Sequence, residues 1–256
     1  AGKGILGSNW VGLKHLKRFL EAPYSWKLMW NTLVLNLYSF LGFPVPIIIA
    51  LILNEIRNKS YKKTIQTVIC APNFISTVVM VGIIFLFTDK SSGVINSVIS
   101  GLGFKRIAFM TEEKWFRPVY VISGIWQTAG WSSIIYVSAL SGVDQGMHEA
   151  AIIDGANRFQ RIFHVDLATL RPTIIINMLM TLGHMLSVGF EKVYMMQLPL
   201  NLDISEVIST YTYKIAFEGG SFSYSTAIGL FLNVINLILL TLFNAAAKKT
   251  TDTGLW

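Results

Sequence analysis

The sequence predicts an all-α integral membrane protein. Of its 256 residues, 53% are hydrophobic and only 14% are charged, whereas about 25% are charged in ordinary soluble domains. The chain also contains several uncharged windows of about 20 residues, the length with which an α-helix crosses a bilayer. The alternation of apolar and polar residues that marks membrane β-strands is not seen. Helices, which satisfy their own backbone hydrogen bonds in lipid, are therefore expected.

Five candidate membrane spans follow from the uncharged windows, at residues 33–53, 65–88, 118–140, 173–190 and 226–247. The fourth is short, and can extend toward residue 194 if Glu191 and Lys192 reach the membrane interface with their charged ends. Pro44 and Pro46 interrupt the first window and Pro72 the second, so breaks are expected there. Buried helices of a large soluble protein are the alternative, which five windows in so short a chain disfavour.

Residues 1–25 are predicted to form an extracytoplasmic or interfacial segment. One face of a short helix collects Trp10, Leu13, Leu16 and Leu20, while Lys14, Lys17 and Arg18 lie elsewhere. This pattern suits a helix lying in the membrane interface, and equally suits an amphipathic helix that docks on the rest of the protein.

The formal charge of +7 is spread between apolar spans and forms no dense basic run. Lipid headgroups are therefore the expected counter-charge, and no nucleic acid partner is expected. Cys70 is the only cysteine, which excludes an internal disulfide and a cysteine-based metal site.

A charged, helix-forming insert at 141–172 separates the third and fourth windows, and its main part reads HEAAIIDGANRFQRIFHVDLATLRP. The run at 148–151 favours a helix, and Gly155 predicts a break before a second short helix at 157–163. Apolar residues such as Ile152 and Ile153 alternate with charged ones. The insert therefore suits a groove on another protein, although an ordinary connecting loop fits this pattern equally well.

Glu149-Ala150-Ala151, Asp154-Gly155-Ala156, Phe163 and Pro172 resemble, in type and spacing, the EAA loop of the membrane subunits of binding-protein-dependent ABC importers. In that family the loop is cytoplasmic and forms a coupling helix that sits in a cleft of the ATPase subunit. The resemblance implies a set of coupling residues, which are Glu149, Ala150, Ala151, Asp154, Gly155, Ala156, Arg158 and Phe159. The family often has a proline where this chain has Ala168, so the exit into the fourth span is expected to be a more continuous helix.

Further segments are similar to the carbohydrate permease branch that imports complex oligosaccharides, namely NWVGLKHLKRFL, GFEKVYMM, STYTYKIAF, YSTAIGLF and the final GLW. This resemblance covers nearly the whole chain. It implies a single permease domain over 1–256, placed as a multi-pass protein in the bacterial cytoplasmic (inner) membrane. It also implies the six-helix type I importer core, with five helices visible and the first missing from this sequence.

No phosphate-binding loop of the form G-x-x-x-x-G-K-[ST] occurs, so ATP is expected to be hydrolysed on another chain. No catalytic residue, metal or cofactor is expected on this chain; ATP and Mg²⁺ are used by the partner. The resemblance implies two ATPase subunits, a second permease subunit of different sequence, and an extracytoplasmic solute-binding protein received by the outer segments 89–117 and 194–225. An ATP-independent secondary transporter or channel is the alternative, which the lack of mid-span acidic residues disfavours.

A substrate path for sugars needs uncharged hydrogen-bonding groups and flat aromatic faces near the middle of the spans. The candidates are Asn73, Trp126, Gln127, Trp131, Asn177, His184 and Tyr194, with Asn36, Tyr136, Asn233 and Asn236 as a wider set. His184 stands out as ionisable and mid-span. Each can instead bond a neighbouring helix or mark the interface. The basic excess suggests an acidic, uronide-type oligosaccharide.

Overall fold

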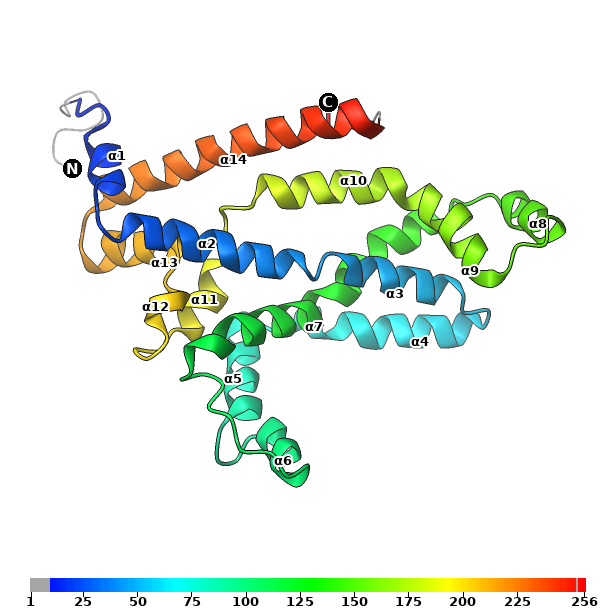
Figure 1. The fold of residues 1–256 in the computed structure, drawn as a ribbon, viewed down its shortest axis with the longest axis horizontal. Helices are drawn as coiled ribbons and strands as arrows, with labels where there is room; N and C mark the ends of the chain where they lie inside the picture. The colour runs from blue at the N-terminus through cyan, green and yellow to red at the C-terminus, as the bar shows by residue number, and fades with distance from the viewer. Residues whose placement is uncertain (1–9, 252) are drawn as a thin grey trace.

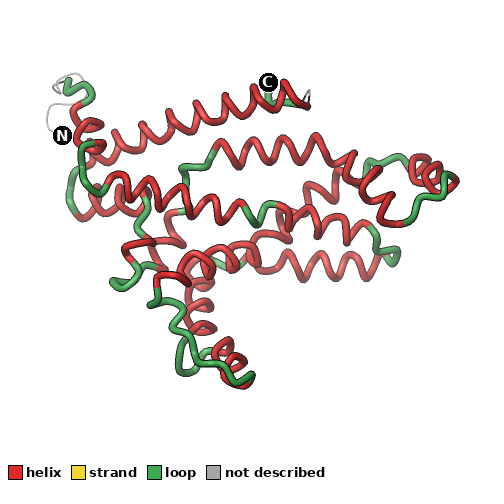
Figure 2. Tube along the Cα trace, in the orientation of Figure 1, coloured by secondary structure: helices red, strands yellow, loops and turns green. Residues whose placement is uncertain are grey.

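The computed structural model describes residues 10–251 and 253–256, so residues 1–9 of the expected interfacial segment lie outside the described residues. In the described part the chain forms helices and loops without strands (Figure 2). Its helical elements are α1 (Lys14–Leu20), α2 (Ser25–Phe40), α3 (Pro44–Asn54), α4 (Lys59–Cys70), η1 (Ala71–Phe74), α5 (Thr77–Thr88), α6 (Val94–Gly101), α7 (Glu113–Leu140), α8 (Gln145–Ile153), α9 (Arg158–Arg161), η2 (Ile162–Asp166), α10 (Leu167–Gly183), α11 (Phe190–Met196), α12 (Leu202–Ser205), α13 (Ile208–Tyr213), η3 (Lys214–Glu218) and α14 (Phe222–Thr251).

Most of the long helices run roughly along one axis, with short helices at its two ends, while α5 and α6 project to one side (Figure 1). One end carries α8 and α9 together with the α3–α4 connection, whose Arg57, Lys59 and Lys63 are exposed. The other end carries α1 and α11–α13. The helices α2–α3, α7 and α14 run toward the α8 end, whereas α4 and α10 run away from it, which is the alternation expected of successive spans.

Among the described residues, three helices are long and apolar enough to cross a membrane, namely Ser25–Asn54, Arg158–Gly183 and Phe222–Thr251, or four if the bent pair Lys59–Phe74 and Thr77–Thr88 counts as one span. They confirm the first and fifth predicted windows and part of the fourth. The proline positions are confirmed as well, because Pro44 begins α3 and Pro72 lies in η1. Proline is tolerated in a first helical turn, where its missing N–H would have no partner.

The second window, 65–88, is not one straight span. Residues Lys59–Phe74 and Thr77–Thr88 form a pair bent by 98°. The Ser76 side chain accepts a hydrogen bond from the Val79 N–H and so begins a new helix in a new direction.

The fourth window, 173–190, is wrong at both ends. Its helix is already under way at Arg158 and ends at Gly183, so the predicted extension toward residue 194 does not exist. Asn236 of α14 holds the non-helical stretch beyond Gly183, because its Oδ1 accepts the Leu186 N–H and its Nδ2 donates to Ser187 Oγ. The expected continuous exit from the insert is confirmed, since α9, η2 and α10 follow one another without a gap.

The third window lies in α7, a helix of 28 residues that contacts α2, α3, α4 and α10. The apolarity of α7 falls short of the other spans, because Ser, Thr, Gln, Gly and Trp interrupt it. Gly130 lets α7 approach α4 closely: a Cβ there would lie 2.0 Å from the Ile69 carbonyl oxygen. Such close approach through small residues is typical of membrane helix packing.

Helix α1 docks on the protein through a residue outside the predicted apolar face. Phe19 is fully buried against Leu28, Ile208, Tyr224 and Ile228, while Trp10, Leu13 and Leu20 are exposed. The exposed residues keep an interfacial placement compatible with this docking.

Candidate coupling loop and translocation cavity

The insert forms two short helices joined at Gly155, as the sequence predicts. Asp144 begins α8 by accepting the Gly146 N–H at 2.9 Å. Gly155 ends it with φ +78°, and the Gly155 and Ala156 N–H groups donate to the Ile152 and Ala151 carbonyls at 3.0 and 2.9 Å. This is a Schellman ending, in which only glycine takes the left-handed position without strain.

Asn157 then begins the second helix with a reciprocal cap. Its Oδ1 accepts the Gln160 N–H, and Gln160 Oε1 accepts the Asn157 N–H at 2.7 Å. The insert is therefore locally determined at both of its helix boundaries.

The predicted coupling residues lie together at the outer tip of the insert. Glu149, Ala150, Asp154, Gly155 and Arg158 are exposed, and Ala151 and Ala156 are half-buried. Apolar side chains are exposed beside them: Ile153 is 85% and Phe159 74% accessible. Exposed apolar residues with charges around them are typical of protein interaction surfaces.

Charged and amide side chains join this insert to the end of α3. His148 Nε2 on α8 lies 3.2 Å from Asp166 Oδ1, and Asn54 Nδ2 donates to the same oxygen at 3.4 Å. Arg158 forms an ion pair with Glu55. Asp166 is only 1% exposed and precedes α10 directly. A displacement of α8 therefore acts on both α3 and α10.

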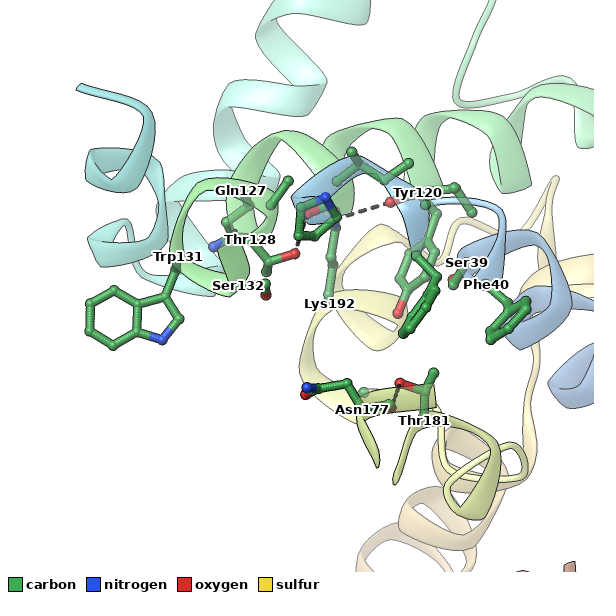
Figure 3. A pocket seen from close by; sticks show the side chains of 18 of the residues that line it. Ser39, Phe40, Tyr120, Gln127, Thr128, Trp131, Ser132, Asn177, Thr181 and Lys192 are labelled. Atoms are coloured by element: carbon green, nitrogen blue, oxygen red, sulfur yellow. Dashed lines mark hydrogen bonds between the residues drawn. The ribbon is translucent and has the colours of Figure 1, made fainter. Parts of the chain in front are cut away.

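A cavity of about 860 Å³ lies between the long helices (Figure 3). Side chains from the end of α2, the start of α3, and α5, α7, α10 and α11 line it. Its polar lining consists of hydroxyl, amide and ammonium groups, contributed by Ser39, Thr77, Tyr120, Gln127, Thr128, Ser132, Tyr136, Asn177, Thr181 and Lys192. Aromatic faces come from Phe40, Phe43 and Trp131 as well as the tyrosines. This combination suits a ligand with both hydroxyl and C–H surfaces.

The structure brings three of the seven predicted path residues into the cavity lining: Gln127, Trp131 and Asn177. Gln127 Nε2 also donates to the Ile75 carbonyl at 3.1 Å, beside the bend between η1 and α5. Trp131 packs edge-to-face on Phe74. Of the wider set, Tyr136 lines the cavity.

The other four predicted path residues, Asn73, Trp126, His184 and Tyr194, do not line the cavity. His184 follows the last residue of α10 and is exposed, so the expectation that it is mid-span is wrong. Tyr194 stacks on Phe190 with 5.2 Å between ring centroids and packs edge-to-face against Tyr213 with 5.1 Å between centroids. Asn73 is half-buried in η1, and Trp126 faces outward from α7.

Lys192 is a cavity residue that the sequence placed elsewhere. Its side chain does not reach away to an interface: Nζ donates to the Tyr120 carbonyl of α7 at 3.1 Å and lies 4.9 Å from the centre of the Tyr120 ring. The local sequence carries no signal for this position, because it depends on the packing of α11 against α7.

Apolar helices pack here around a cavity that combines apolar, aromatic and hydrogen-bonding side chains, and a compact, exposed insert lies at one end. This arrangement is typical of a multi-pass membrane transport subunit. The model of the family described as "Binding-protein-dependent transport system inner membrane component" matches residues 42–252, and the chain belongs to this family.

Relatives and solved structures point to the same branch. The chain is 43% identical, over 99% of its length and 79% of the relative, to the polygalacturonan/rhamnogalacturonan transport system permease protein YteP of Bacillus subtilis (strain 168). It is 42% identical to Protein LplB of the same organism, over 99% of this chain and 80% of the relative. A bacterial ABC transporter involved in the import of the acidic polysaccharide alginate has a chain with a TM-score of 0.90 and 36% identity, with 97% of this chain and 87% of that chain covered. The type I importer permease fold and the sugar permease branch are thereby confirmed.

Proposed function

We propose that this chain is the transmembrane subunit of an ATP-driven ABC importer and forms half of the translocation path for an oligosaccharide. The observation that supports this most strongly is the placement of the EAA insert, which is exposed at its tip and tied at its base to α3 and α10. The cavity is lined by those same helices and by α7. Movement of the insert by ATPase subunits therefore reaches the cavity walls, as alternating access requires.

The chain itself has no part in catalysis under this proposal. Two ATPase subunits bind ATP and Mg²⁺, and one of them receives the tip of the insert. A second permease subunit completes the cavity. The whole assembly sits in the bacterial cytoplasmic membrane, with the α8 end in the cytoplasm.

A solute-binding protein delivers the sugar at the opposite end. A solved alginate transporter of the same fold is described in complex with an alginate pentasaccharide-bound periplasmic protein. The outer segment 89–117 is well suited to such docking, because Asn96 fixes it by donating to the Ile107 carbonyl at 2.8 Å and accepting the Ile107 N–H at 2.7 Å. Hydrogen bonds from Ser91 and Ser92 hold the pKa of Asp89 well below its usual range, so this carboxyl stays charged at the outer surface.

The substrate is proposed to be an acidic, uronide-type oligosaccharide. The names of the polygalacturonan and alginate systems to which this chain is similar refer to polymers of uronic acids. The cavity of this chain offers hydroxyl, amide and aromatic groups for sugar rings and one ammonium for a charge.

Uptake into proteoliposomes tests this function. The complete complex, purified from its native host and reconstituted with its binding protein, is expected to accumulate oligogalacturonides only when ATP is supplied on the side of the insert. A complex with an ATPase subunit disabled for hydrolysis serves as the control. Uptake that continues without ATP would instead identify an ATP-independent carrier and refute the proposal.

A further inference from the structure

Among the described residues that line the cavity, only Lys192 is charged. Its ammonium lies over a part of α7 where Gly124 has no side chain, since a Cβ there would be 3.4 Å from Nζ. The Tyr120 carbonyl and ring, one turn earlier on α7, also hold the ammonium. The position of the charge is thus built by two elements and is not an accident of a free side chain.

The ion pairs formed within residues 10–251 and 253–256 do not include Lys192. The adjacent Glu191 is exposed and is not among the residues that line the cavity. An ammonium has three N–H donors, and the Tyr120 carbonyl takes one of them. The remaining donors are available to a ligand that enters the cavity.

A charge held away from bulk water is costly unless an opposite charge accompanies it. Within membrane proteins, such residues therefore mark substrate paths. The rest of the lining is uncharged: apolar and aromatic side chains make up much of it, and hydroxyl and amide groups stand among them. These groups suit the C–H faces and the hydroxyls of a sugar, so the missing counter-charge is most simply a carboxylate carried by the same sugar.

We infer that Lys192 is the residue of this subunit that selects acidic oligosaccharides, by pairing its ammonium with the carboxylate of one uronate unit as the chain passes through the cavity. Asn177 and Thr181 of α10 lie across the cavity from it and are placed to meet the hydroxyl groups of the same sugar ring (Figure 3). The inference rests on the proposed importer function and adds to it the residue that recognises the negative charge of the substrate.

The test compares trigalacturonate with its methyl ester, which keeps the sugar stereochemistry and loses the charge. Uptake by the reconstituted complex is measured for wild type, Lys192→Met and Lys192→Arg. Lys17→Met is the matched control, because Lys17 is exposed on α1, lies outside the cavity and the proposed docking segments, and forms its ion pair with Glu21. Size-exclusion profiles and tryptophan fluorescence verify that each variant assembles.

Wild type and Lys17→Met are expected to prefer the acid. Lys192→Met should lose about tenfold in uptake of the acid and the preference with it, whereas Lys192→Arg should keep the preference. A Lys192→Met complex that still prefers the acid would overturn the inference, as would a wild type that imports neutral oligosaccharides only. Both of these results leave the importer function standing. If no oligosaccharide is taken up in an ATP-dependent manner, the proposed function and the inference are both refuted.

Discussion

Replacing Glu149 by arginine is expected to remove sugar-stimulated ATP hydrolysis from the purified complex. Glu149 is exposed on α8, and its side chain makes no ion pair within the part of the chain that the structure describes. The substitution therefore leaves the fold of this subunit intact and changes only what α8 presents to its partner. Charge reversal at a buried protein interface costs several kcal/mol, so stimulated turnover should fall at least about tenfold.

The measurement is ATPase activity of the copurifying material with and without substrate-loaded binding protein. Glu21→Arg is the matched control, because Glu21 is equally exposed on α1 and its ion pair with Lys17 contributes little to stability. Equal stimulation of the Glu149 variant and wild type would show that α8 does not receive the ATPase.

Replacing Gly130 by alanine is expected to destabilise the subunit strongly. The new Cβ would lie 2.0 Å from the Ile69 carbonyl oxygen and 2.5 Å from its carbon. Both are backbone atoms of α4, so no side-chain rotation relieves the overlap and the two helices must move apart. Overpacking of this kind costs about 1–3 kcal/mol or more. Because Gly130 adjoins the cavity residue Trp131, the shift also deforms the path.

Gly82→Ala provides the comparison for this variant. A Cβ at Gly82 of α5 would meet nothing within 4 Å, and alanine favours a helix over glycine by roughly 1 kcal/mol. The yield of monodisperse complex and its thermal unfolding midpoint should thus fall for Gly130→Ala and hold or rise for Gly82→Ala. Equal midpoints for Gly130→Ala and wild type would contradict the close packing of α4 and α7.

The fold was largely predictable where a local signal determines it. Uncharged windows locate the spans, Gly155 locates the end of α8, and Pro44 and Pro72 locate breaks. Prediction fails where a residue distant in the sequence determines where a helix ends. The apolar run after Gly183 continues without a charge, yet the helix stops there, because Asn236 of α14 binds the backbone of Leu186. Such a contact across about fifty residues leaves no trace in the local pattern.

The candidate site divides in the same way. The coupling residues form one contiguous stretch, so the sequence could present them together. The cavity is assembled from six helices, and hydropathy alone could not separate Gln127, which lines it, from its neighbour Trp126, which faces outward. The sequence predicts an interface position for Lys192, because a charged residue beside a span usually lies there. Its true place depends on the backbone of Tyr120 and the bare surface at Gly124.

Site-specific photo-crosslinking in the native host tests most directly whether α8 is the point at which an ATPase acts on this subunit. A benzophenone amino acid is placed at Ile153, which is 85% exposed on α8, and in a second strain at Leu102, which is 70% exposed beyond α6. The account predicts an adduct with an ATPase chain from position 153 and none from position 102. ATPase captured at 102, or absent at 153 from a complex that still transports, would contradict it.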